Sequence, residues 1–240
     1  VPPGLDFAHW LERIAVLMPA LGGEESRAAI EAAIVECVAA GTGLVGDVSD
    51  TGRSVEPLVR SGLRARVFHQ VLAFDPRRAE ATFAGARARL LELAAASGPG
   101  VRHALAPHAP YSVSARLLRL VRGFNGQEGR PTSIHLAESA AEEEFFSTGG
   151  GALAELKQAL GTTVDGWEPP GQPPVVYLAR LGWFESPGLV VHCTQLSARG
   201  IEILRQAPIT ARLCPRSNRA LGGGGAPARA LAAAGVPRAL

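Results

Sequence analysis

Cysteine, lysine and aromatic residues are scarce in this chain of 240 residues, and long apolar runs are missing. The three cysteines, Cys37, Cys193 and Cys214, are odd in number and lack Cys-x-x-Cys spacing, which argues against a disulfide framework and against a zinc ribbon. No apolar stretch reaches the roughly 18 residues that span a bilayer, and the N-terminus lacks the pattern of a secretion signal. We therefore expect a soluble, cytoplasmic protein without membrane partners.

The only lysine, Lys157, lies in segment 152–160, whose apolar spacing predicts a helix. A Schiff-base mechanism requires a lysine amine in a pocket, so lysine-dependent aldolase chemistry is disfavoured. The net charge is only +2, and the arginines are scattered through predicted helices. A nucleic-acid partner is therefore not expected.

The 47% hydrophobic content fits one domain over residues 1–240. Predicted strands and helices alternate, which indicates an α/β fold with a parallel sheet covered by helices. The strands are expected at 43–48, 65–72, 101–106, 132–135, 188–192 and 209–213, with a seventh beginning at 236–240. The helices are expected at 7–18, 24–40, 55–61, 77–96, 115–124, 198–206 and 228–234, with another that has the acidic run 142–144 near its start. An eight-stranded (β/α)8 TIM barrel of this kind would lack its first strand and most of its last.

Segment 161–174 is the longest stretch without a periodic pattern, and it contains Trp167. Long irregular loops in compact domains often carry function. We expect Trp167 to help wall the substrate pocket.

Three of the six histidines, His108, His135 and His192, lie at or just after the ends of predicted strands. In a βα-barrel these positions open onto the active site. Glu138 follows His135 by three residues. An imidazole binds Zn²⁺, and a nearby carboxylate that does not bind the metal can move protons between an activated water and a leaving group. A buried structural histidine followed by a helix-starting glutamate is the alternative, and the repetition at other strand ends favours the metal site.

Four segments in this order and at these intervals resemble the amidohydrolase superfamily. The resemblance is to its branch of metal-dependent aminohydrolases and chlorohydrolases, which includes cytosine deaminase-like and triazine hydrolase-like enzymes. The segments are Ala-Pro-His-Ala-Pro-Tyr-Ser at 106–112, His-Leu-Ala-Glu at 135–138, Val-His-Cys at 191–193 and Cys-Pro-Arg-Ser-Asn at 214–218. The resemblance covers nearly the whole chain.

The resemblance implies a role for each matching residue. His135 would be a metal ligand, Glu138 the general acid and base, and His192 the group that orients the attacking water. The substrate pocket would be lined by His108, Arg216 and Asn218. One divalent metal is implied, with zinc favoured and iron as the alternative, because two-metal members commonly use a carboxylated lysine on a strand.

The implied reaction is hydrolytic deamination, or related C–N or C–Cl cleavage, of a small aminated heterocycle. Adenine-type nucleosides, other purines or pyrimidines, and triazines all belong to this class.

Two features of the family are missing from the chain: the His-x-His pair of its first strand and the metal-binding Asp of its eighth. We expect a fragment of an active enzyme. A naturally truncated, inactive barrel that serves binding or assembly is the alternative. A metal-free phosphate-binding barrel isomerase is disfavoured, because Gly222–Gly225 lacks a Gly-Lys-Ser/Thr ending and reads as a flexible connector.

A barrel without a closing strand exposes two sheet edges, and such edges pair readily with other chains. We predict that these 240 residues, expressed alone, are poorly soluble or form a homo-oligomer. Size-exclusion chromatography with light scattering measures this. A monomer with a sharp, cooperative melting transition would contradict the prediction.

Overall fold

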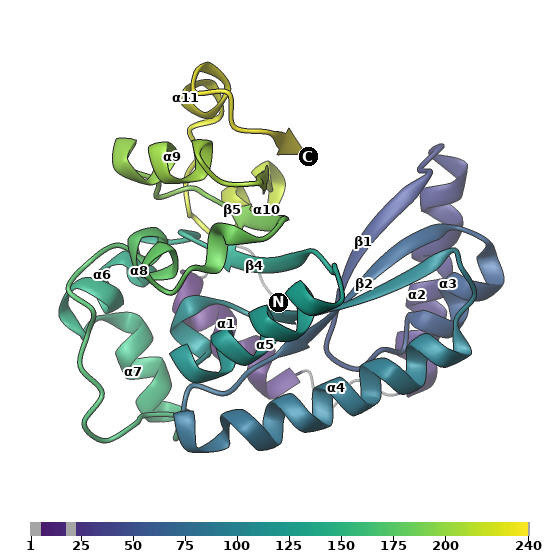
Figure 1. The fold of residues 1–240 in the computed structure, drawn as a ribbon, viewed down its shortest axis with the longest axis horizontal. Helices are drawn as coiled ribbons and strands as arrows, with labels where there is room; N and C mark the ends of the chain where they lie inside the picture. The colour runs from purple at the N-terminus through teal and green to yellow at the C-terminus, as the bar shows by residue number, and fades with distance from the viewer. Residues whose placement is uncertain (1–5, 18–22, 240) are drawn as a thin grey trace.

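The computed structural model describes residues 6–17 and 23–239 (Figure 1). Its strands are β1 (Leu44–Ser49), β2 (Arg64–Val71), β3 (Val101–Pro107), β4 (Thr132–Leu136), β5 (Gly188–His192), β6 (Ile209–Arg212) and β7 (Arg238–Ala239). Its helices are α1 (Phe7–Leu17), α2 (Gly23–Ala39), α3 (Val55–Ser61), α4 (Ala79–Ala96), α5 (Ala115–Gln127), α6 (Ala140–Thr148), α7 (Ala152–Ala159), α8 (Pro174–Arg180), α9 (Ala198–Arg205), α10 (Pro215–Ala220) and α11 (Ala228–Ala233).

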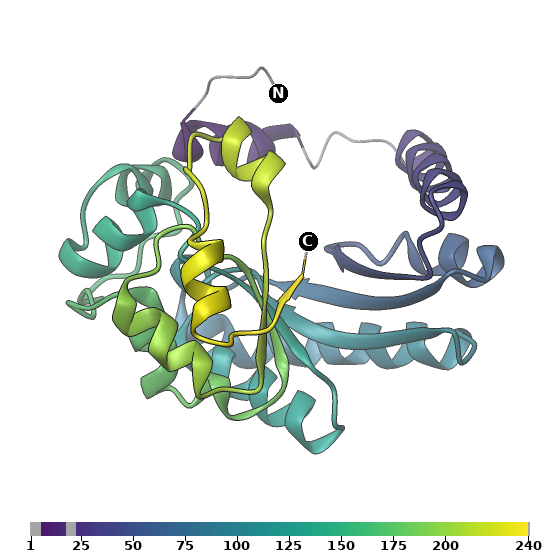
Figure 2. The same ribbon diagram turned by 90° about the horizontal axis from the view of Figure 1, so that it is seen from above.

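The strands form two parallel sheets, in the order β1-β2-β3 and β4-β5-β6-β7. Parallel neighbours require crossover connections, and here each crossover contains at least one helix. Figures 1 and 2 show α4 running along β2 and β3 on the outer face of the first sheet. The predicted α/β class is confirmed, and each predicted strand is found with ends shifted by at most two residues. Met18, the predicted end of the first helix, lies outside the described residues.

Helices α8 and α10 were not predicted. Both begin at a proline, Pro174 and Pro215, that occupies the first turn. Proline suits this position because its fixed φ matches the helix and its missing N–H would have no partner there. The two helices are only 7 and 6 residues long, too short for an apolar period to reveal them.

Side chains of α5 and its C-terminal loop bond the free edge of β3. The Leu105 N–H donates to Asn125 Oδ1 at 3.2 Å, and Asn125 Nδ2 donates back to the Leu105 carbonyl at 2.8 Å. Arg130 Nη1 donates to the His103 carbonyl at 2.7 Å. The sheets then meet at the C-terminal end of the strands, where the His135 N–H donates to the His108 carbonyl at 2.9 Å.

The largest buried apolar cluster crosses this junction and joins the two sheets to five helices. Its members include Leu90, Leu105, Leu117, Ile134, Leu178, Val190, Leu204, Ala211 and Leu231. These side chains come from both sheets. Their apolar packing therefore holds together the two sheets, which are not joined by a continuous strand ladder. The C-terminal strand ends are thereby kept in a fixed relation to one another.

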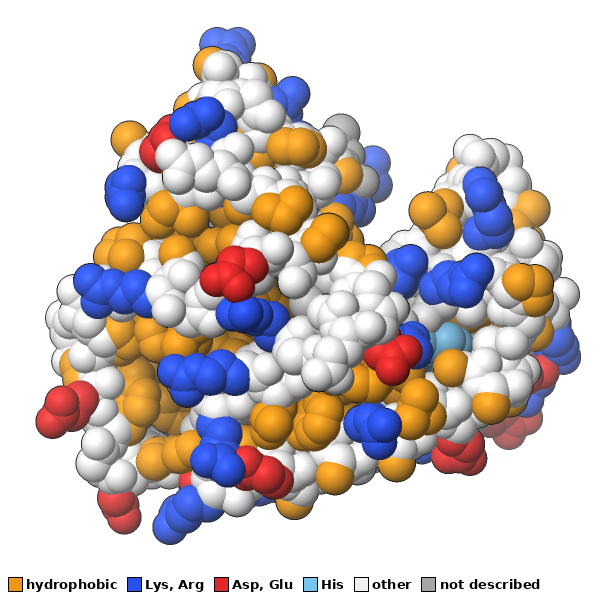
Figure 3. Space-filling view, viewed as in Figure 1, with side chains coloured by type: hydrophobic (Ala, Val, Ile, Leu, Met, Phe, Trp, Pro, Cys, Tyr) orange, Lys and Arg blue, Asp and Glu red, His pale blue; other side chains and the backbone are white. Residues whose placement is uncertain are grey.

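On the face shown in Figure 3, basic side chains are scattered among acidic and apolar ones. Within the described residues, none of the helices combines the length and apolar character needed to cross a membrane.

We predict that Asn125→Leu lowers the free energy of unfolding by about 2–5 kcal/mol, because it leaves two buried backbone groups of Leu105 without partners. Gln127→Leu, at an exposed position of the same helix, is the matched control and should change stability by less than about 0.5 kcal/mol. Urea unfolding measures both. Equal stability of the two variants would contradict the role given to the Asn125 amide.

Candidate active site

Three imidazoles gather at the C-terminal ends of β3, β4 and β5. His108 follows β3, while His135 and His192 lie at the ends of β4 and β5, whose register pairs Leu136 with His192. The ring centroids of His108 and His135 are 5.0 Å apart, and those of His135 and His192 are 5.4 Å apart. The structure therefore brings together the three histidines that the sequence singled out.

Burial keeps all three rings neutral near pH 7. It lowers the pKa of His108 to about 3 and that of His192 to about 4, and it also lowers the pKa of His135. The neighbouring imidazoles add to the shifts of His108 and His192. Neutral imidazole is the form that binds a metal ion.

The tautomer of His135 is fixed by the backbone. Its Nδ1 lies 2.7 Å from the His108 carbonyl oxygen, which only accepts hydrogen bonds, so Nδ1 carries the proton. The lone pair of the neutral ring is therefore on Nε2. A histidine held in this way by a carbonyl has the orientation common among metal ligands.

Glu138 and His192 face each other in the site. Asn218 Oδ1 accepts from His192 Nδ1 at 2.8 Å, so the neutral ring presents the Nε2 lone pair to Glu138 Oε1 at 3.2 Å. Burial raises the pKa of Glu138 to about 7, so the protonated and the ionised carboxyl are both populated near neutral pH.

The strand ends that carry these groups have an unusual backbone. Ala137, His192 and Cys193 have φ of 51°, 76° and 57°, a region that residues other than glycine rarely adopt. Cys193 N–H donates to the Leu136 carbonyl at 3.0 Å, so each turn supports the other. Such strain persists where the surrounding structure holds it, and here it directs Glu138 and His192 toward each other.

Two residues that the sequence placed elsewhere support Glu138 from behind. Glu142 lies in the first turn of α6, as expected for the acidic run, but it is also almost fully buried and accepts from the Glu138 N–H at 2.9 Å. Burial raises its pKa to about 8. Gly223, in the predicted connector, packs so closely that an added Cβ would lie 3.1 Å from the Glu138 carbonyl oxygen. The acidic run at the start of α6 and the glycine run 222–225 do not indicate, from the sequence alone, that Glu142 and Gly223 contact Glu138.

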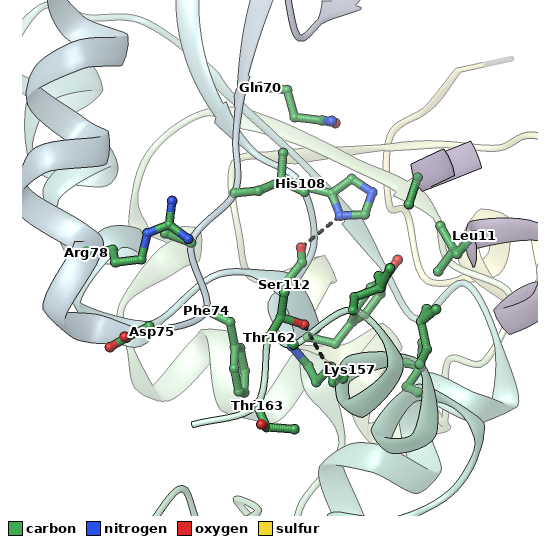
Figure 4. Close-up of a pocket in the computed structure, with 18 of the residues that line it drawn as sticks. Leu11, Gln70, Phe74, Asp75, Arg78, His108, Ser112, Lys157, Thr162 and Thr163 are labelled. Carbon is green, nitrogen blue, oxygen red and sulfur yellow. Dashed lines mark hydrogen bonds between the residues drawn. The ribbon is translucent and has the colours of Figure 1, made fainter. Parts of the chain in front are cut away.

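A cavity of about 630 Å³ opens beside His108 (Figure 4). Ser112 Oγ lies 2.7 Å from His108 Nδ1, and Gln70 Nε2 donates to Asp50 Oδ1 at 2.6 Å on another wall. Lys157 also lines it. The cavity places small-molecule binding next to the histidine cluster.

Three predicted pocket residues, Trp167, Arg216 and Asn218, are not among the described residues that line this cavity. Trp167 stacks on Phe145 with centroids 4.6 Å apart and lines a separate hollow of about 270 Å³ beside Tyr177. Arg216 is exposed on α10 and is not among the described residues of the cavity wall. Packing of Trp167 on Phe145 holds the irregular loop 161–174 on the side of the smaller hollow. On helix α10, Asn218 faces inward while Arg216 faces solvent.

The described part of the chain supplies only a portion of a metal site. His135 Nε2 is free to coordinate, yet in residues 6–17 and 23–239 no three or more His, Cys, Asp or Glu side chains are grouped to hold a metal ion. A catalytic zinc site ordinarily has three protein ligands. These residues fit one side of such a site and do not complete it.

The protein-family comparison identifies the chain. The family model described as Amidohydrolase family matches residues 3–240. The chain belongs to the amidohydrolase family. The resemblance drawn from the four sequence segments is thus confirmed.

Individual relatives of this amidohydrolase are deaminases. It is 34% identical over 243 residues to an aminodeoxyfutalosine deaminase of Deinococcus radiodurans. The aligned region covers 98% of this chain and 57% of the relative. An adenosine deaminase structure from Xanthomonas campestris with bound zinc is 26% identical, with a TM-score of 0.79 over 99% of this chain and 51% of that one. Helicobacter pylori aminofutalosine deaminase with methylthio-coformycin is 24% identical, with a TM-score of 0.88 over 99% of this chain and 57% of that one.

The fold of these structures confirms the amidohydrolase barrel predicted for this chain. The chain spans little more than half the length of the relatives it matches.

Glu142 gives the amidohydrolase a stability that depends on pH. Its pKa is raised from 4.5 to about 8 on folding, so its contribution is complete below pH 4.5 and is lost as the pH rises through 8. We predict that Glu142→Gln, which stays neutral, loses roughly 3 kcal/mol less stability than the parent between pH 5 and pH 8. Denaturant unfolding across this range measures the difference. Glu144→Gln, at an exposed position of the same helix, should keep the parent's dependence; a parent-like slope in Glu142→Gln would contradict the prediction.

Proposed function

We propose that this amidohydrolase hydrolytically deaminates an adenine-type nucleoside. In that reaction the oxygen of water replaces the amino group of the ring, and ammonia leaves. The 3.2 Å approach of Glu138 Oε1 to His192 Nε2, beside the Nε2 lone pair of His135, carries the proposal. The named activities of the Deinococcus, Xanthomonas and Helicobacter proteins support the choice of substrate.

Glu138 is positioned to move the protons of this reaction. A carboxyl with a pKa of about 7 can take a proton from the attacking water and deliver it to the departing amine at neutral pH. His192, fixed by Asn218, holds the carboxyl in place and presents a polar ring to the attacked carbon. His108 and Ser112 border the cavity in which the nucleoside would lie.

His135 Nε2 is the atom of this chain best placed to bind a divalent metal, zinc in preference to iron. When bound, the metal would supply Lewis-acid activation of the attacking water.

We predict that Glu138→Gln, made in the complete gene product, lowers kcat for adenine-nucleoside deamination by roughly 10²–10⁴-fold, because an amide cannot carry the proton. Ammonia release and the ultraviolet change of the purine report the rate. Metal content, measured by mass spectrometry, should match the parent because Glu138 is not a ligand. The control Glu144→Gln should have parental kcat. Unchanged turnover in Glu138→Gln would remove the basis of the proposal.

A non-catalytic binding or assembly module is the second candidate, favoured by the incomplete ligand set of the described residues. The same experiment separates the two functions. A complete gene product that binds nucleosides but releases no ammonia, even with zinc or iron supplied, would establish the binding module instead.

A further inference from the structure

The backbone of Glu138 is held by side chains. Its N–H donates to Glu142 Oε2 at 2.9 Å, and its carbonyl oxygen accepts from Thr194 Oγ1 at 2.6 Å. Among the described residues, neither group has a backbone partner. Strand β4 ends at Leu136 and α6 begins at Ala140, so Glu138 lies between two elements whose own hydrogen bonds do not include it. The position of this residue therefore depends on the two side chains that bond it.

The hydroxyl of Thr194 bonds two consecutive carbonyl groups of the loop after β4. Its Oγ1 lies 2.6 Å from the Glu138 carbonyl oxygen and 3.0 Å from that of Ala137. Carbonyl oxygens only accept, so the hydroxyl proton is directed toward them. The oxygen in turn accepts from Gln195 Nε2 at 3.3 Å. The shorter of the two donated contacts is the one to Glu138.

The neighbours of Thr194 bond the same loop through their backbone. The Cys193 N–H donates to the Leu136 carbonyl at 3.0 Å, and the Gln195 N–H donates to the Ala137 carbonyl at 2.9 Å. Both of these bonds are independent of the side chain at position 194. Among the hydrogen bonds of the described residues, the Glu138 carbonyl receives only that of the Thr194 hydroxyl. Removal of this hydroxyl would therefore release Glu138 and leave the rest of the contact between the two loops in place.

The released segment would have a reason to move. Ala137 has a φ of 51°, in a region that residues other than glycine rarely adopt, and such a conformation persists only where its surroundings hold it. Relaxation of this residue would turn Glu138, whose Oε1 lies 3.2 Å from His192 Nε2. Thr194 follows His192 by two residues. One short loop thus bonds Glu138 at two places, with an imidazole at the carboxyl and a hydroxyl at the carbonyl.

We propose that Thr194 is a positioning residue for deamination, because its hydroxyl fixes the Glu138 backbone and so keeps the carboxyl against His192. This inference rests on the proposed deaminase function. Thr194 is not among the described residues that line the cavity beside His108. Its loss should therefore act on the proton transfer and leave nucleoside binding nearly unchanged, which means a lower kcat at a similar KM.

The test uses the complete gene product, with adenosine, 5′-deoxyadenosine and 5′-methylthioadenosine as probes. We expect Thr194→Val, which keeps the shape and removes the hydroxyl, to lower kcat roughly 10- to 100-fold with KM within about threefold of the parent. Thr194→Ser keeps the hydroxyl and should retain kcat within about threefold. Thr148→Val is the matched control. It removes a hydroxyl that donates to the Glu144 carbonyl at 2.9 Å, at an exposed end of α6, and should have parental kcat.

A double-mutant cycle separates positioning from a general structural role. In a Glu138→Gln background, Thr194→Val should lower the residual rate less than about threefold, because the carboxyl that Thr194 positions is already gone. Incomplete folding would lower the rate equally in both backgrounds. Equal losses in the two backgrounds, parental kcat in Thr194→Val, or a Thr194→Ser variant as slow as Thr194→Val would each overturn the inference.

Hydrogen exchange of the Glu138 N–H tests the same contact without turnover. We expect exchange at this amide to be roughly 10-fold faster in Thr194→Val than in the parent, because the loop opens more often. Thr194→Ser and Thr148→Val should exchange at the parental rate. Faster exchange in a gene product that deaminates none of the three nucleosides would support the hold of Thr194 on Glu138 and overturn the proposed function. Active deamination with parental exchange and parental kcat in Thr194→Val would overturn the role of Thr194 alone.

Discussion

The carbonyl oxygen of His108 is the acceptor on which the site depends. It receives the backbone N–H of His135 at 2.9 Å and the ring Nδ1–H of the same residue at 2.7 Å. The first bond joins the two sheets where the strands end, and the second fixes the ring. A shift between β3 and β4 would therefore also turn the imidazole. Fold and site are coupled here through one atom.

That coupling explains why the edge of β3 is bonded by side chains. Asn125 bonds the backbone N–H and carbonyl of Leu105 at the edge of the first sheet. These groups therefore have partners without β4 pairing with β3 along its whole length. β4 can then approach β3 at its C-terminal end, where the His108 carbonyl receives it. A continuous ladder would have satisfied the same backbone groups, but it would have set the position of His135 by strand pairing alone.

The sequence was sufficient to predict the strands and the convergence of their histidines, because parallel strands end at one edge and a short apolar run marks each strand. It was insufficient wherever the outcome depended on which side of a helix faces inward. Glu142 and Lys157 both lie on predicted helices, yet the helical patterns do not show that Glu142 packs against the Glu138 backbone or that Lys157 lines the cavity. Arg216 and Asn218 are two residues apart on helix α10. The orientation of that helix buries Asn218 and leaves Arg216 exposed to solvent. Trp167 stacks on Phe145, which lies in a different segment. No local sequence pattern predicts that these two segments approach each other.

Burial shifts the pKa values of the Glu138 carboxyl and the Lys157 amine in opposite directions and brings both to the same range. It raises the pKa of the Glu138 carboxyl to about 7 and lowers that of the Lys157 amine to about 7. Both shifts favour the uncharged form, because each group has lost water without gaining a full counter-charge.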